Sequence, residues 1–395
     1  MMGTMSLDTT KILILDANQR SALATTRSLG QLSGVELSCA DNSISALAGS
    51  SRYCRNYYQS PCPQTSPIAF LDWLEALVTQ QGFDFVFPMT EISSQLLLMN
   101  RERLGNSQLP FADYNTVMTL ADKGKLTQLA TQLGIPHPDT QYYASAAELD
   151  TGSISHYPTV IKPNMSRIWT GEHWIDTTVK IADNAQQLQR DLQADYLQDY
   201  PFMQQAFIPG HGAGVFALYN RGQAVTFFAH QRLREKPPRG GVSVLSRSVA
   251  LDDELLSITK KLLDGVQWHG VAMVEFRIDP QGRPYLMEVN TRFWGSLQLA
   301  IDSGVDFPKL LCQICLGQNP HPSADYNSNQ RLRWLLGDVD SLYIYLKDSG
   351  FSLKEKLARI GQFLTPQANT RHEVNRLGDL KPAWFELKKY LRELF

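Results

Sequence analysis

Two glutamates and an asparagine in the second half of the chain have the types and spacing of a metal site. Glu275 lies in one predicted strand, Val271–Ile278, Glu288 lies in the next, Pro284–Val289, and Asn290 follows directly. The Asp-Pro-Gln-Gly sequence between the strands is a strong turn, so we expect antiparallel neighbours. Alternation along a strand then puts Glu288 and Asn290 on one face.

Two carboxylates and an amide oxygen on one face form a hard-oxygen site suited to Mg²⁺ and to the phosphate oxygens that it binds. A glutamate flanked by Met287 and Val289 is costly to bury unless something pairs with it. The alternative is an ordinary solvated sheet face. Arg292, again two residues on, would suit a transferring phosphoryl group. Its alternative is a surface salt bridge.

The whole segment reads E-x12-E-x-N-x-R and continues as Phe-Trp-Gly-Ser. It resembles the metal-binding end of ATP-grasp enzymes such as biotin carboxylase, D-alanine–D-alanine ligase and the carbamoyl phosphate synthase large subunit. The resemblance implies that ATP is the cofactor with Mg²⁺, or Mn²⁺ in its place. It implies that Glu275, Glu288 and Asn290 are the metal ligands and that Arg292 contacts the phosphate or the substrate.

Two lysines fall at further positions of the same resemblance. Lys123, in Asp-Lys followed by Leu-Gly-Ile-Pro, would reach an ATP phosphate, and Lys162, at the end of an apolar strand, would hold the α- and β-phosphates. Without the resemblance, Lys123 would be interpreted as a solvated helix residue, and Lys162 as a residue at the sheet edge whose amine extends to solvent. The segment Asn164–Gly171 departs from the glycine-rich loop of the family, which leaves its closure over phosphates open.

The segment Met203–Gly210 resembles the strand between domains that recognises adenine. Gln205 would contact the adenine edge, because an amide both donates and accepts, and the backbone of Phe207 and Ile208 would supply the other hydrogen bonds. The alternative is a buried strand. The acidic residue that often binds ribose is missing, so that contact stays unassigned.

The densest basic cluster, His230–Gly241, resembles the family's strand and loop beside the substrate. The resemblance implies that Arg232 holds an acyl phosphate and makes Arg239 and Arg247 candidates for substrate carboxylates. The alternative is a solvated hairpin. Cys312 and Cys315 form a C-x-x-C in an apolar helical run, which predicts a buried helix face over a redox or metal role.

Strand and helix signals alternate at the start of the chain, which predicts a parallel sheet. The fold class is α/β and α+β multidomain, an ATP-grasp fold with an N-terminal Rossmann-like domain. The predicted domains are 1–120 (α/β), 121–205 (small lid), 206–318 (large, with the metal site) and 319–395 (extension of unknown role). We predict an irregular region at 43–67 and helices at 91–104 and 185–197.

The 395 residues carry a formal net charge of −2, so no overall basic field draws in nucleic acid or an anionic membrane. The first ten residues lack the pattern of a signal peptide, which predicts a cytoplasmic protein. The expected partners are a small-molecule carboxylate and an amine, and a homodimer is left open.

Together these features predict an ATP-dependent ligase that activates a carboxylate as an acyl phosphate and couples it to an amine. Two alternatives stay open, a phosphotransferase on the same scaffold and a non-catalytic ATP-binding regulatory module.

Overall fold

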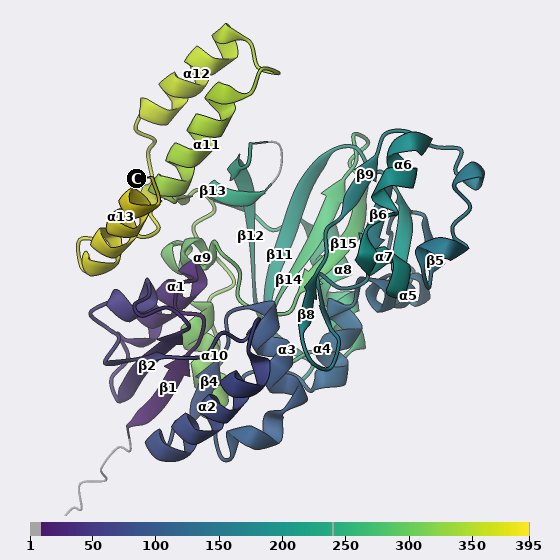
Figure 1. The fold of residues 1–395 in the computed structure, drawn as a ribbon. Helices are drawn as coiled ribbons and strands as arrows, with labels where there is room; N and C mark the ends of the chain where they lie inside the picture. The colour runs from purple at the N-terminus through teal and green to yellow at the C-terminus, as the bar shows by residue number, and fades with distance from the viewer. Residues whose placement is uncertain (1–8, 239–240, 395) are drawn as a thin grey trace, which may run out of the picture.

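The computed structural model describes residues 9–238 and 241–394 of the chain. Three main sheets and the helices that cover them make up the molecule (Figure 1). The predicted α/β and α+β architecture is confirmed. Within the described residues, no helix is long and apolar enough to cross a membrane.

Four parallel strands form the N-terminal sheet in the order β3-β2-β1-β4. The strands are β1 (Thr10–Ile14), β2 (Val35–Asp41), β3 (Asn56–Gln59) and β4 (Phe85–Phe87). The helical segments are α1 (Arg20–Leu29), η1 (Ala48–Ser50), α2 (Pro67–Gln81), α3 (Glu91–Met99) and η2 (Arg101–Leu104). The order reverses at β1, whose neighbours are β2 and β4, and such a point is where open parallel sheets form their ligand crevice.

Three predictions of local structure are wrong. The region 43–67 is not wholly irregular, because β3 lies in it and extends the sheet. The helix predicted over 91–104 breaks at Asn100, whose side chain donates to the carbonyl of Leu96 at 2.9 Å and competes with helix continuation. The helix predicted over 185–197 is two short helices, α6 (Ala185–Asp191) and α7 (Asp195–Asp199).

A smaller antiparallel sheet, β5-β10-β6-β9, lies at the other end of the molecule with α6 and α7 (Figure 1). Helices α4 (Tyr114–Ala121) and α5 (Lys123–Gln132) lead into it, and a two-stranded hairpin, β7-β8, leaves it. The strands are β5 (Thr140–Tyr143), β6 (Thr159–Pro163), β7 (Arg167–Trp169), β8 (Trp174–Asp176), β9 (Lys180–Ala182) and β10 (Phe202–Ala206). Two 3-10 turns, η3 (Ala146–Glu148) and η4 (Thr151–Ser153), complete this part.

The large sheet has seven strands in the order β15-β14-β11-β12-β13-β16-β17. They are β11 (His211–Asn220), β12 (Gln223–Lys236), β13 (Val242–Val249), β14 (Gly270–Ile278), β15 (Pro284–Asn290), β16 (Arg331–Arg333) and β17 (Thr370–His372). The helices are α8 (Asp253–Gly265), α9 (Leu297–Ser303), α10 (Phe307–Cys315), α11 (Leu335–Lys347), α12 (Leu353–Leu364) and α13 (Lys381–Leu394). The last two strands come from the predicted C-terminal extension, which therefore contributes to the same sheet as the metal-end residues.

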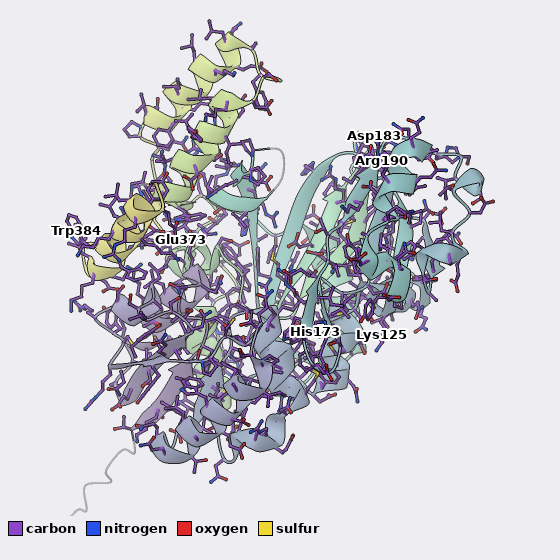
Figure 2. All side chains as sticks on the ribbon, viewed as in Figure 1. Lys125, His173, Asp183, Arg190, Glu373 and Trp384 are labelled. Carbon is purple, nitrogen blue, oxygen red and sulfur yellow. The ribbon has the colours of Figure 1, made fainter. Side chains whose placement is uncertain are left out.

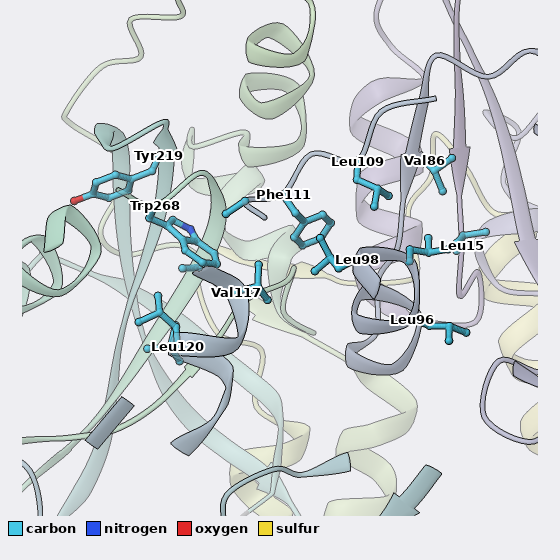
Figure 3. Packing of buried hydrophobic residues seen from close by; sticks show 14 of the residues in the cluster. Leu15, Val86, Leu96, Leu98, Leu109, Phe111, Val117, Leu120, Tyr219 and Trp268 are labelled. Carbon is cyan, nitrogen blue, oxygen red and sulfur yellow. The ribbon is translucent and has the colours of Figure 1, made fainter. Parts of the chain in front are cut away.

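One hydrophobic cluster joins the N-terminal sheet to the large sheet (Figure 3). Leu15 and Val86 enter it from the parallel sheet, while Tyr219 and Trp268 enter from the large sheet and the turn before β14. Trp268 is 0% exposed. Because side chains from both sheets pack into this one core, the two sheets are held in a fixed position relative to each other.

Candidate active site

The two predicted acidic ligands lie opposite each other on neighbouring strands. Glu275 of β14 pairs in register with Glu288 of β15, and the Nδ2 of Asn290 donates to Glu275 Oε1 at 3.1 Å. The register shifts between Glu275 and Phe276, so that one residue of β15, Met287, is left out of the pairing. The structure thus brings the three predicted metal ligands together at one end of the hairpin.

Burial and mutual repulsion give the two carboxyl groups different proton affinities. Burial, followed by the charge of Glu288, raises the pKa of Glu275 to about 7, against the opposing effect of Arg232. Burial also opposes ionisation of Glu288, but Lys162, the next cause, and other nearby cations outweigh it and lower its pKa. A half-buried pair of carboxylates with lysines and arginines nearby suits a divalent cation and the anion that accompanies it.

Both predicted phosphate lysines reach this pair. Lys162 at the end of β6 is buried, and its Nζ donates to the unpaired carbonyl of Met287 at 2.7 Å. Burial lowers the pKa of Lys162 to about 8. Lys123, the first residue of α5, donates from its Nζ to Ser166 Oγ at 2.8 Å. The side chain of Asp122 caps this helix by accepting from the backbone N–H groups of residues 124 and 125, which fixes where the lysine emerges.

Two arginines flank the acidic pair. The Nη2 of Arg292 donates to Asn290 Oδ1 at 3.3 Å, and its Nη1 donates to the carbonyl of Phe293 at 3.1 Å. The Nη2 of Arg232, on β12, lies 3.4 Å from both carboxylate oxygens of Glu275. The structure therefore joins Arg232 to a residue 43 positions away, on the far side of β13 and α8 in the sequence.

The rest of the Phe-Trp-Gly-Ser segment, Trp294 to Ser296, packs against the sheet and against α1. The Trp294 ring packs 4.2 Å from the ring of Phe216, centroid to centroid, and is 3% exposed. A Cβ on Gly295 would lie 3.2 Å from the guanidinium of Arg20, on α1. Ser296 Oγ lies 2.9 Å from the Nε2 of His230, which is itself buried. The segment thus anchors the metal end to the sheet beneath it.

The predicted adenine-recognition residues lie on or directly after β10, which pairs with the strand of Lys162. Met203 pairs in register with Lys162, so Gln205, two residues on, shares its face of the small sheet. Gln205 is buried, and its Nε2 donates to Thr140 Oγ1 at 3.0 Å. Phe207 and Ile208 follow β10, and the carbonyl of Ile208 accepts from Arg277 Nε at 3.0 Å. Part of the hydrogen-bonding capacity expected for adenine is therefore already used within the protein.

The segment 164–171 is not an open loop. It includes β7, which pairs with β8, and the rings of Trp169 and Trp174 lie 5.0 Å apart. Trp174 belongs to the core cluster, and Gln64 from the N-terminal part donates to Asp176 at 3.1 Å. The hairpin is therefore held by aromatic packing where the family uses glycine-rich backbone.

Of the other two candidate arginines, only Arg247 lies within the described residues, and it is not at the site. Arg247 pairs in register with Gln231, one residue from Arg232, so it lies on the opposite face of the sheet from Arg232. Its Nη2 donates to Gln231 Oε1 at 3.2 Å. The expectation that it contacts the substrate is not supported by this position. Arg239 lies outside the described residues.

A cavity of about 620 Å³ extends from the metal end to the carboxyl edge of the N-terminal sheet. Glu288, Asn290 and Arg292 line one end of it. Residues that the sequence analysis did not single out line much of the remainder, among them Asp16, Asn18, Asp41 and Glu91.

Asp16 carried one recognisable signal, an acidic residue directly after the first strand. It has φ 54°, and its carboxylate accepts from the backbone N–H groups of Met89 and Thr90, which joins the ends of β1 and β4. Burial raises its pKa. Nothing in the sequence signalled Glu91, because its position in the cavity depends on how the two sheets pack.

The C-x-x-C pair lies on α10, as the apolar run predicted. Cys312 is 0% exposed, and both thiols are free. Burial raises the pKa of Cys312 to about 11 and that of Cys315 to about 12. Among the described residues no cluster of three or more His, Cys, Asp or Glu side chains gathers, so these thiols have no companion ligands there.

Residues 198–337 match a family model described as "ATP-grasp in the biosynthetic pathway with Ter operon". No curated protein matches the chain.

Several solved structures are similar in fold. An L-amino acid ligase from Bacillus licheniformis aligns over 78% of this chain and 74% of its own at 19% identity, with a TM-score of 0.61. A biotin carboxylase from Campylobacter jejuni, in a β,γ-ATP complex, aligns over 82% and 75% at 17% identity, with a TM-score of 0.64. The biotin carboxylase domain dimer of a Hydrogenobacter thermophilus 2-oxoglutarate carboxylase, with MgADP, aligns over 82% and 73% at 15% identity, with a TM-score of 0.62.

The fold and the match over the large sheet define the class of protein. The chain has the ATP-grasp fold, as the resemblance predicted, and residues 198–337 match an ATP-grasp family model.

Proposed function

We propose that the protein is an ATP-dependent ligase that activates a carboxylate as an acyl phosphate and couples it to an amine, with release of ADP and phosphate. The observation that carries this proposal is the 620 Å³ cavity, which begins at Glu288, Asn290 and Arg292 and continues to the edge of the parallel sheet. It offers room for small molecules beyond a nucleotide's terminal phosphate.

The charges at the site favour the binding of a nucleoside triphosphate. Lys123 and Lys162 come from two elements and converge on Glu288, whose pKa both lower. Glu275, Glu288 and Asn290 would hold Mg²⁺, which would neutralise phosphate charge when bound. The solved relative with MgADP carries that ion together with a nucleotide.

The adenine end of the proposed nucleotide site lies on the lid sheet. Gln205 of β10 and Lys162 of β6 share one face of the small sheet, and this face would span from the base to the phosphates. The backbone of Phe207 and Ile208 would complete the contacts with adenine. The carbonyl oxygen of Ile208 accepts one hydrogen bond from Arg277, and its second lone pair would accept another from adenine.

The proposed reaction has two steps. A carboxylate oxygen attacks the γ-phosphorus of ATP, the bond from that phosphorus to the bridging oxygen breaks, and ADP leaves. An amine nitrogen then attacks the carbonyl carbon of the acyl phosphate, loses a proton and expels phosphate. Arg292 and Arg232 would hold the acyl phosphate between the steps, since a guanidinium matches the geometry of a phosphate group.

ADP release and phosphorus NMR test the proposal with panels of carboxylates and amines. A ligase releases ADP and inorganic phosphate only when both substrates are present. An organic phosphate as the end product would instead show a phosphotransferase. Binding of ATP with Mg²⁺ by calorimetry without turnover on any pair would show a regulatory module.

A further inference from the structure

The C-terminal helices α11 and α12 form a hairpin that projects from the body of the molecule (Figure 1). Its base is anchored by Asp338, which is 0% exposed and pairs with Arg234 of β12 and Arg333 of β16. At the start of α12, Ser352 and Glu355 form a reciprocal capping box. The hairpin is therefore a defined element that is fixed at one end and surrounded by solvent along much of its length.

An apolar stripe runs along the outer face of α12. Leu353, Leu357 and Leu364 are 74%, 60% and 70% exposed, and Ile360, half-buried, lies between the last two. Their spacing of four, three and four residues is the heptad pattern with which one helix packs against another. Single exposed leucines are common, but a stripe of three leucines and an isoleucine at this spacing is not expected on a solvated helix.

The stripe is not the face that holds α12 to the rest of the protein. Arg359 is buried, and its Nη2 lies 3.3 Å from Asp338 Oδ1. The guanidinium of Arg333 lies over the Phe363 ring, with its Cζ 4.3 Å from the ring centroid. These residues point toward α11 and the sheet, whereas the leucines on the other side of α12 are exposed.

We propose that this stripe, Leu353, Leu357, Ile360 and Leu364, is a dimer interface in which α12 packs antiparallel against α12 of a second copy of the chain. The inference does not depend on the proposed reaction. A two-fold axis beside the helix would pair Leu353 with Leu364 of the partner subunit, and Leu357 with Ile360 of the partner subunit. Such an interface is self-complementary, as closed two-fold dimers require.

The charges beside the stripe favour the antiparallel arrangement. The lysines that flank it, Lys354 and Lys356, both lie in the first turn, whereas Gly361 and Phe363 take the corresponding positions in the last turn. Antiparallel packing sets each lysine-bearing end against the uncharged end of the other helix, whose carbonyl groups attract cations. Parallel packing would instead gather four lysines at one end.

Sedimentation velocity of the full chain between roughly 1 and 100 µM tests the interface, in the concentration range expected for contacts below the standard size. We expect a concentration-dependent dimer. Leu357→Glu should raise the dissociation constant about 100-fold or more, because each dimer would lose two buried leucines. The control is Leu377→Glu at a leucine that is 94% exposed and outside the hairpin, which should leave the dimer intact.

A chain that stays monomeric throughout this range, or a dimer that Leu357→Glu does not weaken, would overturn the proposal. Circular dichroism and thermal unfolding confirm that the variants are folded. Orientation is tested by oxidation of cysteine variants. Leu353→Cys combined with Leu364→Cys should give a covalent dimer, and Leu353→Cys alone should not. A covalent dimer from the single variant would overturn the antiparallel arrangement.

Discussion

At the scale of single residues, the proposed site depends most on Glu288, which faces Glu275 across two strands and is surrounded by cations. Glu288→Gln keeps the shape of the side chain and removes the charge. We expect kcat to fall about 100-fold or more, because charge stabilisation at a reacting phosphate is commonly worth that much. The measurement is steady-state release of ADP. Glu102→Gln, at an exposed carboxylate on η2, is the matched control and should leave kcat unchanged. Turnover of the Glu288 variant at the wild-type rate would reject its assignment.

His230 should make the folded protein less stable at acidic pH. Burial, with the charge of Arg232, lowers the pKa of His230 to about 3. The unfolded chain binds a proton there below about pH 6.5, while the folded chain does not, so stability falls as the pH is lowered through that value. The expected loss between pH 7.5 and pH 5 is about 2 kcal/mol.

Urea unfolding of His230→Gln at the two pH values measures this effect, since the variant should lack about 2 kcal/mol of the wild-type pH dependence. His173→Gln, at an exposed position on the lid hairpin (Figure 2), should keep the wild-type dependence. Equal pH dependence in the wild type and in His230→Gln would contradict the assignment.

At the scale of elements, helix α11 positions the strand that carries Arg232. Asp338 on α11 pairs with Arg234 of β12, and Ser341 Oγ donates to the carbonyl of Glu235 at 2.7 Å. Asp338→Asn would leave buried arginines without their carboxylate, which typically costs about 3–5 kcal/mol.

Thermal and urea unfolding should show that loss. Asp340→Asn, two residues further on the same helix, breaks the half-exposed pair with Lys236 and should cost about 1 kcal/mol or less. Comparable losses in the two variants would argue against a special role of the buried cluster.

At the scale of the whole molecule, the C-terminal segment is built into the fold from both sides. Glu373, which directly follows β17 and is labelled in Figure 2, is 2% exposed and pairs with Arg20 of α1. Asp379 accepts from Arg27 of α1 at 2.9 Å, and both side chains are buried. Because β16 and β17 also extend the large sheet, this segment links the N-terminal and large parts.

Deletion of residues 319–395 should therefore lower the melting temperature by roughly 10 °C or more, since it leaves two buried arginines unpaired. Differential scanning calorimetry measures the change. Trp384→Ala, at a tryptophan that is 60% exposed on α13, should shift the melting temperature by only a few degrees, about 3 °C or less. A truncated chain as stable as the full one would show that these contacts contribute little.

The sequence alone was enough to predict the ATP-grasp fold and to place the candidate metal ligands side by side. Glu275, Glu288 and Asn290 lie on two strands joined by one tight turn, so two-residue alternation and turn chemistry are enough to bring them together. The roles expected of Lys123 and Lys162 came from resemblance to ATP-grasp enzymes. The structure places Lys123 and Glu288 on the wall of one small pocket and Lys162 on the carbonyl of Met287, next to Glu288.

Tertiary structure alone decided the contacts between distant segments. It set Arg232 against Glu275, turned Arg247 to the other face of the sheet, and built β16 and β17 from the predicted extension. It also formed the cavity, whose far wall comes from the edge of the parallel sheet. Such contacts depend on how whole sheets pack and on small register shifts, and neither is encoded in the spacing of nearby residues.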